Sequence, residues 1–248
     1  ALGLGCQTFS HFNFIPVGRG QEIAQYDLTP AQRENLLCIL NRYLQEGEIS
    51  VMSTAPQFGR ACLVYAPTDG LMATAHAGSG RGGKTRVLAK YLGGCGAGRC
   101  YCSIQPNGKV NPCVYMPGNE VGDLRQAPLI DIWNNSLFAV LSDRQDRGDH
   151  CGICDYRYYC GGCRARALSY TDDIQAGDPG CAYNLHVWEE VTNSSQAQLV
   201  ALGQQPFPDN FLAGMTDGAL GQKTAGNVLV RELGRVLADV SGRAQGND

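Results

Sequence analysis

The order of hydrophobic and polar positions in the first quarter of the chain predicts a strand, a helix and a second strand. Residues 11–17, HFNFIPV, form a short apolar run that ends at the sequence GRG, and residues 49–53, ISVMS, form another. Between these runs, apolar residues recur at the spacing of one helix face: Leu36, Leu37, Leu40, Tyr43 and Leu44. An apolar strand, a helix and an apolar strand in this order are typical of a parallel α/β layer.

The predicted helix has recognisable signals at both ends. Thr29 is placed to cap the first turn, Pro30 occupies the first helical position, and Gln32 is placed to bond back to the cap. Gly47 follows the last apolar residue of the helix face, so the helix is expected to end there.

Beyond residue 65 the composition changes. Residues 66–98 are rich in Gly, Ala and Thr and are predicted to form a connecting region with a short helix at 85–92. The stretch from Cys102 to Met116 predicts a β-hairpin, because Asn107-Gly108 supplies the positive φ angles of a tight turn. Such a turn brings Cys102 and Cys113 close together across two strands.

Helical patterns dominate the second half of the chain. Pro128 begins a predicted helix that runs to about Arg144, with one apolar face made of Leu129, Trp133, Leu137 and Val140. After Cys181, amphipathic helical segments are expected near 184–202 and 224–240.

Composition and charge exclude several classes of protein. The chain has 248 residues, enough for one large domain or two smaller ones, and its net charge of −3 gives no footprint for nucleic acid. No apolar stretch approaches the roughly 18 residues that span a bilayer, and no signal peptide is visible. We therefore expect no membrane partner and a cytoplasmic location. The sequence begins ALGLGC without Met, which we interpret as a fragment or a processed chain.

Twelve cysteines stand out against this ordinary composition. The segment GGCGAGRCYCSIQPNGKVNPC provides four: Cys95, Cys100, Cys102 and Cys113. The segment CGICDYRYYCGGC and the later DPGC provide five more: Cys151, Cys154, Cys160, Cys163 and Cys181. In a long chain without a secretory signal, closely spaced cysteines are more often metal ligands than disulfides. These nine exceed the needs of one zinc ion and suffice for two iron–sulfur clusters with one position left over.

Two other interpretations of these motifs stay open. A zinc ribbon would use four cysteines of the second group but would leave the first group unexplained. The string GSGRGGKT at 78–85 fits a phosphate-binding loop, with Gly78, Gly83, Lys84 and Thr85 in place. However, residues 71–75 make a poor preceding strand, and PLID at 128–131 starts a helix where a magnesium-binding Asp should end a strand.

The stretch from about Gly93 to Asn184 resembles the SPASM domain, the auxiliary-cluster module that follows the barrel of many radical S-adenosylmethionine (radical SAM) enzymes. Gly108-x4-Cys113, the series from Cys151 to Cys163 and the distant Cys181 carry this resemblance. The flanking segments GNEVGDLRQAPLIDIWNNS and CGGCRARALSYTDD are similar to the subgroup of haem d1, alternative-haem and tungsten-cofactor maturases.

The resemblance implies two [4Fe–4S] clusters with crossed ligand sets. One cluster would be held by Cys95, Cys102, Cys113 and Cys163. The other would be held by Cys151, Cys154, Cys160 and Cys181. Cys100 is the odd one out and could replace Cys95 in the first set.

The resemblance extends upstream and implies the fold. IPVGRGQEIAQYDLTPAQ and VMSTAPQFGR resemble the last strands of the radical SAM partial barrel. The implied α+β architecture is a C-terminal remnant of the partial (β/α) barrel at 1–66 and a SPASM domain with a β-hairpin and short helices at 67–186. A small helical tail at 187–248 would complete it.

The chain departs from the family at the radical-generating site. No three cysteines have the Cys-x3-Cys-x2-Cys spacing that in this family holds the cluster binding S-adenosylmethionine. We therefore expect S-adenosylmethionine and a third [4Fe–4S] cluster only in a longer parent chain. This chain alone is not expected to be catalytically competent.

Two functions are consistent with these patterns. The chain is either the C-terminal part of a radical SAM maturase acting on a tetrapyrrole, a metal cofactor or a peptide, or a stand-alone iron–sulfur module for electron transfer or binding. The expected partners are a redox donor such as ferredoxin or flavodoxin, and a small-molecule or peptide substrate.

A few other residues are candidates for a role. His150 borders Cys151 and could tune a cluster, whereas the remaining histidines, His11, His76 and His186, are scattered. Arg164 and Arg166 could pair with substrate carboxylates, and pairing with Asp172 or Asp173 is the simpler expectation. Cys38 and Cys62 fall in helix and strand patterns and are expected to be small apolar residues rather than ligands: neither belongs to a closely spaced group.

Overall fold

The structure is a computed structural model that describes residues 1–74 and 78–201. The chain divides into two compact units, Ala1–Trp188 and Glu189–Asp248. The short N-terminal elements are η1 (Leu2–Leu4), β1 (Thr8–His11) and η2 (Gly18–Tyr26). The longer helices are α1 (Pro30–Glu46), α2 (Gln57–Tyr65), α3 (Gly82–Leu92), α7 (Arg164–Thr171) and α8 (Leu185–Ala201), and the short ones are α4 (Leu129–Ile132), α5 (Ser136–Ser142) and α6 (Asp149–Ile153). The remaining strands are β2 (Ser50–Ser53), β3 (Met72–Thr74), β4 (Gly78–Gly80), β5 (Ser103–Ile104), β6 (Lys109–Asn111) and β7 (Gly122–Asp123).

The first unit begins with the predicted parallel α/β layer. β1 pairs with β2 in parallel, with Thr8 opposite Ser50 and His11 opposite Ser53, and α1 connects the two strands. The prediction of a strand over residues 11–17 was wrong, because the strand precedes that run. After His11 the Asn13 N–H bonds the Thr54 side chain at 2.8 Å instead of continuing the ladder, and Pro16 has no N–H to offer.

The ends of α1 follow the predicted chemistry. The Gln32 N–H donates to Thr29 Oγ1 at 3.3 Å, and the Thr29 N–H donates to Gln32 Oε1 at 3.0 Å, which completes a capping box. Gly47 follows the helix in the left-handed conformation. The apolar face of α1 packs into a core with α2, β2 and β3 that includes Leu37, Leu40, Leu44, Val51, Phe58 and Met72.

The connecting region contains more order than predicted. Met72–Thr74 and Gly78–Gly80 form the antiparallel pair β3–β4. The prediction that residues 71–75 make a poor strand was therefore wrong, because they contain β3. The first three residues of GSGRGGKT are therefore themselves a paired strand, and they do not form the free loop that a phosphate site needs. The helix that follows, α3, starts three residues earlier than expected and ends at Leu92 as predicted.

The hairpin is confirmed as β5–β6, with Ser103 opposite Asn111, and β7 adds a third antiparallel strand. The Gly108 N–H bonds the Gln105 carbonyl at 2.9 Å, and Gly108 has a φ of 80°. Asn107 does not share the positive φ that was predicted for it. The turn is thus built around one left-handed glycine rather than two left-handed residues.

The helix predicted from Pro128 to about Arg144 is two helices, α4 and α5. Asn135 interrupts it, because its side-chain oxygen accepts the Leu137 N–H at 2.9 Å and caps α5. Asn135 Nδ2 also donates to the Val121 carbonyl at 3.2 Å, which anchors the break to the segment before β7.

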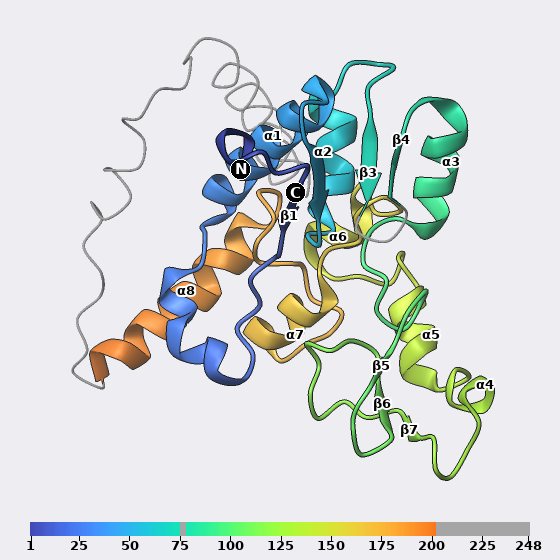
Figure 1. Cartoon of the computed structure of the whole chain (residues 1–248). Coiled ribbons are helices and arrows are strands. Elements are labelled where there is room, and N and C mark those ends of the chain that lie inside the picture. The colour runs from blue at the N-terminus through green and yellow to red at the C-terminus, as the bar shows by residue number, and fades with distance from the viewer. Residues whose placement is uncertain (75–77, 202–248) are drawn as a thin grey trace, which may run out of the picture. The chain divides into compact units, whose positions relative to one another are not determined.

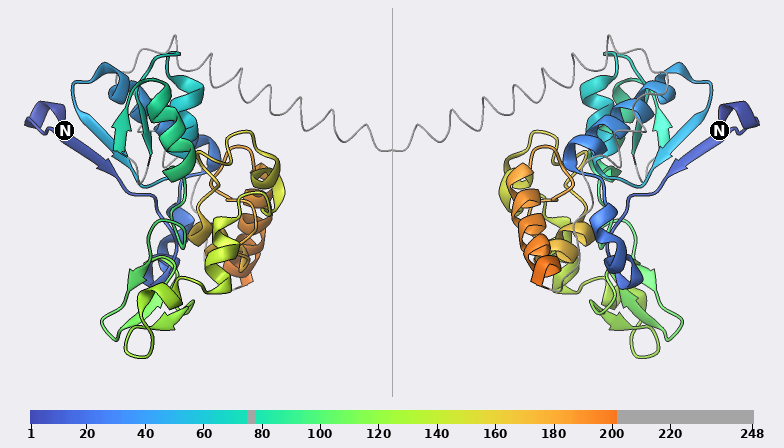
Figure 2. Two further views of the ribbon diagram at one scale, coloured as in Figure 1. Left: turned by 90° about the vertical axis from the view of Figure 1, so that its right-hand side faces the viewer. Right: turned by 90° about the vertical axis from the view of Figure 1, so that its left-hand side faces the viewer.

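Two apolar cores organise the first unit. One lies among α1, α2, β2 and β3, and the other joins the hairpin to α5 and α7 through Val110, Met116, Phe138, Leu141 and Ala165. Figure 1 and Figure 2 show the sheet β5–β6–β7 toward one end of this unit, the β1–β2 layer toward the other, and α6 and α7 between them. The described residues therefore have a mixed α/β architecture with small sheets and without a closed barrel.

The C-terminal predictions are met only in part. The helix expected near 184–202 is α8, whereas the segment expected at 224–240 lies outside the described residues. The proposed barrel remnant and the three domain boundaries stay predictions.

Among the helices in the part of the chain that the structure describes, none is long and apolar enough to cross a lipid bilayer.

Candidate metal centres

The four cysteines predicted to share the second cluster line one cavity. This second site consists of Cys151, Cys154, Cys160 and Cys181, all of them buried. The cavity is also lined by Arg60, His150, Arg157, Gly161, Gly162 and Asn184. The structure thus brings together cysteines that are up to thirty residues apart in the sequence.

Short turns place these four cysteines. Cys151 lies in α6, whose C-cap is Cys154, and a tight turn in which the Cys160 N–H bonds the Tyr156 carbonyl at 2.9 Å brings Cys160 back. Cys181 lies in the turn before α8, where its N–H bonds the Asp178 carbonyl at 3.1 Å. Turns of this kind let one short stretch of chain present several side chains to the same cavity.

Gly162 shows how tightly the second site is enclosed. It has a φ of 62°, and a Cβ atom there would lie 3.1 Å from Cys151 Sγ and in collision with the Arg164 guanidinium. The Gly162 N–H donates to Cys160 Sγ at 3.4 Å. Only glycine combines this conformation with this close approach.

Three thiols of the second site, those of Cys154, Cys160 and Cys181, resist ionisation without a positive centre. Burial raises the pKa of the Cys160 thiol, and the neighbouring Cys151 raises it further. Burial also raises the pKa of the Cys181 and Cys154 thiols, although the nearby Arg60 cation lowers the pKa of both thiols in part. Metal binding requires thiolates, so a bound cation or cluster would stabilise the charged form that burial disfavours.

The donors around the cavity fit an anionic sulfur-rich body. Arg60 and Arg157 line the cavity, and the Nε–H of each is buried without a hydrogen-bond partner among the described residues. Asn184 Nδ2 donates to Cys151 Sγ at 3.4 Å. Donors toward sulfur are a recognised means of stabilising and tuning iron–sulfur clusters. An all-cysteine ligand set with unsatisfied N–H donors therefore suits a thiolate-ligated cluster.

Arg60 is held by a buried ion pair. Its guanidinium, 1 % exposed, forks onto both carboxylate oxygens of Glu34 in α1, and the Tyr65 hydroxyl donates to the same carboxylate. It also lies over the Tyr183 ring, 4.7 Å from the centroid. The N-terminal α/β layer thus contributes a fixed cation to the second site.

The first site is less enclosed. It consists of Cys95, Cys102, Cys113 and Cys163, of which Cys113 and Cys163 are buried in the second apolar core while Cys95 and Cys102 pack against it. Burial raises the pKa of the Cys163 thiol, and the nearby Cys95 and Cys113 raise it further. For Cys102 only burial raises the pKa, so the structure places three of the four in mutual electrostatic contact and Cys102 beside them.

Cys100 stands apart from the first site. Cys100 is an exposed residue, but partial burial of its thiol and then the charge of Cys95 raise the pKa of that thiol, and the cations of Arg99 and Arg144 lower it. The charge of Cys95, in contrast, raises the pKa of the Cys113 and Cys163 thiols as well. This placement favours Cys95 over Cys100 as the ligand.

Tyr101 adds a donor to the first site. Its hydroxyl donates to Cys113 Sγ at 2.7 Å. Burial and then the Cys113 charge raise the pKa of this phenol, so it keeps its proton and stays a donor.

The two sites share backbone. The Cys95 N–H bonds the Cys160 carbonyl at 3.0 Å, which joins a first-site residue to a second-site residue. Only Gly161 and Gly162 separate Cys160 from Cys163. Asp178, fully buried, accepts the Cys163 N–H at 2.7 Å and a Gln57 side-chain N–H at 2.6 Å. The two sites therefore form one continuous assembly.

Within residues 1–74 and 78–201, no group of three or more His, Cys, Asp and Glu side chains is arranged to hold a single metal ion. The ligand sets therefore stay predictions. Of the remaining cysteines, Cys6 is exposed, Cys38 is half-buried, and Cys62 is buried with its thiol 3.8 Å from the Ala73 carbonyl.

The expectations for Arg164 and Arg166 were wrong. Arg164 donates to the carbonyls of Ile174 and Ala176, at 3.0 and 2.7 Å, rather than pairing with Asp172 or Asp173. Arg166 pairs with Asp27, and its Nε lies 3.4 Å from Asp178. Both guanidiniums are fully buried. Arg166 joins α7 to the N-terminal segment through Asp27, whereas the Arg164 guanidinium lies 3.9 Å from Cys151 Sγ at the second site.

The histidines have separate environments. His150 lines the cavity of the second site with its ring edge toward Tyr183, 5.0 Å between centroids. His11 bonds the Ser53 hydroxyl, and His186 pairs with Asp149 at 2.9 Å. His76 lies outside the described residues.

Sequence reasoning missed the residues that complete the sites: Arg60, Glu34, Tyr101, Asp178 and Asn184. Asp178 and Asn184 flank Cys181 within three residues, so their position beside a ligand was a usable signal. Arg60 lies more than ninety residues before Cys151, and nothing local marks it.

Comparison with known proteins supports the cysteine pattern. Residues 95–163 match the SPASM family, described as an iron–sulfur cluster-binding domain. The chain is 32% identical over 185 residues to a protein named AdoMet-dependent heme synthase from Methanosarcina barkeri, covering 74% of this chain and 50% of that protein. No solved structure gives a significant match.

Two shorter similarities involve other chemistry. The chain is 37% identical over 101 residues to a PqqA peptide cyclase from Methylobacterium sp., covering 38% of this chain and 27% of that protein. It is 35% identical over 101 residues to a pre-heme d1 synthase from Dinoroseobacter shibae, covering 38% of this chain and 25% of that protein. The chain spans about half the length or less of these curated relatives.

Proposed function

We propose that this chain, whose residues 95–163 match the SPASM iron–sulfur cluster-binding domain, carries the two auxiliary [4Fe–4S] clusters of a radical SAM maturase. The observation that carries the proposal is the convergence of Cys151, Cys154, Cys160 and Cys181 on one cavity rimmed by unsatisfied arginine N–H donors. Bound at the two sites, the clusters would supply one-electron transfer.

The residues of this chain have defined tasks in that role. The eight cysteines of the two sites hold the irons. Asn184 and the Gly162 N–H donate to sulfur at the second site, whose cavity Arg60 also lines, and Tyr101 donates to sulfur at the first. Burial keeps water from six of the eight cysteines, because Cys113 and Cys163 lie in the second apolar core and all four cysteines of the second site are buried. The protein thereby sets the charge and solvent exposure of each cluster.

For the substrate class we propose a tetrapyrrole rather than a peptide. The similarity to a protein named AdoMet-dependent heme synthase covers 74% of this chain, whereas the similarity to a PqqA peptide cyclase covers only 38%. The chain has no Cys-x3-Cys-x2-Cys spacing, so cleavage of S-adenosylmethionine would need a cluster site from another polypeptide segment. The alternative is an electron-transfer module that binds no tetrapyrrole.

Anaerobic reconstitution with iron and sulfide tests the proposal. We expect brown protein with about eight irons per chain, and cluster signals in low-temperature electron paramagnetic resonance after reduction. Tightly bound zinc with no iron uptake would refute it. The substrate class is tested by titrating the reconstituted protein with a carboxylated porphyrin and, separately, with a ribosomal-type peptide. Absorbance changes with the porphyrin alone would support the tetrapyrrole proposal, and binding of neither ligand would support an electron-transfer module.

A further inference from the structure

The segment that carries the first-site cysteines has an unusual charge. Between Gly70 and Asn119 there are six basic residues and no Asp or Glu, although the whole chain has a net charge of −3. The six are Arg81, Lys84, Arg86, Lys90, Arg99 and Lys109. Four of them lie in α3 or directly before it, so the positive charge is concentrated on one helix.

α3 also turns its apolar stripe outward. Lys84, Val87, Leu88 and Tyr91 follow the i, i+3, i+4, i+7 spacing of one helix face. Val87 is 58 %, Leu88 48 % and Tyr91 73 % exposed, while Ala89 is the residue of this helix that is buried. Figure 1 shows α3 at the outer edge of the first unit, beside β4. An amphipathic helix normally buries this stripe, so its exposure marks an interaction surface.

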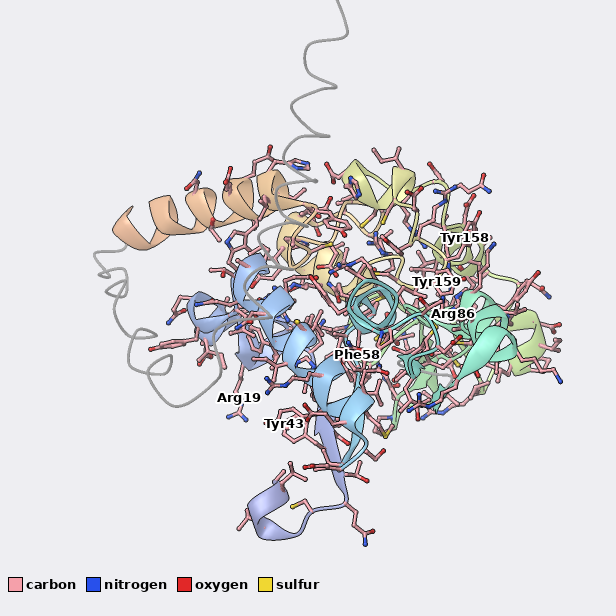
Figure 3. All side chains as sticks on the ribbon, turned by 90° about the horizontal axis from the view of Figure 1, so that it is seen from above. Arg19, Tyr43, Phe58, Arg86, Tyr158 and Tyr159 are labelled. Atoms are coloured by element: carbon pink, nitrogen blue, oxygen red, sulfur yellow. The ribbon has the colours of Figure 1, made fainter. Side chains whose placement is uncertain are left out.

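The cations of this helix keep their charge available. Among the described residues, none of Arg81, Lys84, Arg86 and Lys90 forms an ion pair with a carboxylate. The Arg86 guanidinium bonds the Thr68 carbonyl, and Lys90 Nζ lies 5.6 Å from the centre of the Tyr158 ring. Figure 3 shows Arg86 and Tyr158 on the same side of the unit, with Arg19 on the other. The surface therefore has an uncompensated positive field.

α3 is tied rigidly to the first site. The Arg99 guanidinium donates to the carbonyls of Tyr91 and Leu92 at the end of α3, to Gly93 at 2.7 Å and to Cys95 at 3.3 Å. Arg144 also donates to the Gly93 carbonyl, at 2.6 Å. A partner protein bound to α3 would thus lie next to the first site, the more exposed of the two sites, at a fixed position relative to Cys95.

We propose that the α3 surface, defined as Lys84, Val87, Leu88, Lys90 and Tyr91, is the docking site for a small acidic electron-carrier protein. The inference rests on the proposed function, because it requires a cluster at the first site. One electron passes from the reduced flavin or iron–sulfur centre of the carrier, which is oxidised, to the first-site cluster, which is reduced. No proton or atom moves.

Charge and shape favour this occupant over others. Lysines interspersed with exposed apolar side chains match an interface with an apolar centre and an acidic rim on the partner. A basic amphipathic helix can also bind anionic lipid. The carrier is favoured because the same helix is hydrogen-bonded to the segment that holds the first site, and a cluster there would need an external electron donor. Lipid binding would not explain why the helix is connected to that site.

The test uses protein carrying both clusters, with iron content and paramagnetic resonance measured first. The probe is a dithionite-reduced acidic [2Fe–2S] ferredoxin. We measure its Kd and the stopped-flow rate of cluster reduction at low and high ionic strength. Lys84→Glu with Lys90→Glu should weaken binding by about tenfold or more at low salt, and the difference should shrink at high salt. Tyr91→Ala should weaken binding at every salt concentration.

The matched control is Arg19→Glu with Arg42→Glu, which changes the net charge by the same amount at exposed residues outside α3. It should change the Kd less than twofold. Equal losses in both double variants, or no loss in the α3 variant, would overturn the docking site while leaving the clusters intact. Binding of wild-type protein to phosphatidylserine vesicles, lost in the α3 variant with ferredoxin reduction unchanged, would overturn it in favour of lipid. Absence of iron would instead refute the proposed function, and the docking site with it.

Discussion

The second site is closed and the first site is partly open. All four cysteines of the second site are buried around one cavity, and Arg60 reaches them from the N-terminal layer. At the first site only Cys113 and Cys163 are buried, and the exposed Cys100 lies beside Cys95. The comparison indicates a division of labour, because an enclosed cluster is insulated from solvent and partners whereas an open one can exchange electrons with them.

Removal of a buried ligand should have the largest effect. Cys160→Ala should abolish the second cluster, because among the described residues no fifth cysteine lines that cavity to replace it, and should reduce the iron content to about half. Iron and sulfide quantitation measures this directly. Retention of all iron would show that the second site is not a cluster site.

At the first site, replacing Cys95 and replacing Cys100 should have different effects on cluster binding. Cys95→Ser should lose most of the first cluster, whereas Cys100→Ser should keep it, because Cys95 lies near Cys113 and Cys163 and Cys100 does not. The measurement is iron content with the paramagnetic resonance signal of the remaining cluster. Loss of the cluster in Cys100→Ser, with retention in Cys95→Ser, would reverse the ligand assignment.

The Arg60 cation should tune the closed site alone. Arg60→Gln with Glu34→Gln removes both partners of the buried pair, so no unpaired charge remains. Reduction makes a cluster more negative, so losing the nearer cation should lower the second-site potential by about 59 mV, a tenfold change in the one-electron equilibrium. A redox titration followed by paramagnetic resonance measures it.

The single variants provide the controls for that experiment. Arg60→Lys keeps the charge and should shift the potential less. Arg60→Gln alone leaves Glu34 buried without its partner and should cost about 3–5 kcal/mol of unfolding free energy, measured by denaturant titration. An equal shift of both cluster potentials in the double variant would contradict a local effect of Arg60.

The smallest effects are expected at cysteines outside both sites. Cys38→Ala and Cys62→Ala should leave iron content unchanged. Burial raises the pKa of the Cys62 thiol to about 11, so it is a neutral apolar side chain, and its loss should cost about 1 kcal/mol of stability. Iron loss in either variant would extend the ligand set beyond the eight cysteines.

Local features of the fold could be predicted because their causes are local. The capping box of Thr29 and Gln32, the end of α1 at Gly47 and the hairpin turn at Gly108 each depend on residues within four positions. The spacing of the cysteines likewise indicated an iron–sulfur segment, and the SPASM match over residues 95–163 agrees with it, whereas the crossed ligand sets came from the family resemblance and stay predictions.

The errors have long-range causes. The first strand was misplaced because its position is set by pairing with residues 50–53, forty positions away, rather than by its own hydrophobicity. The pairing of Arg166 with Asp27 spans 139 residues, and no single sequence reveals such a partner. Arg60 belongs to the second site for the same reason, since only the packing of α2 against the cysteine turns brings it there.

The hydrogen bond between Cys95 and Cys160, together with the two glycines before Cys163, has a consequence for electron flow. One direct route between the two predicted cluster sites runs through main-chain atoms, so no side-chain replacement can cut that route. What can lengthen it is an inserted residue within the Gly161-Gly162 link. Such an insertion should slow electron transfer from one cluster to the other while each site still binds iron. This result would distinguish two electronically coupled clusters from two independent ones.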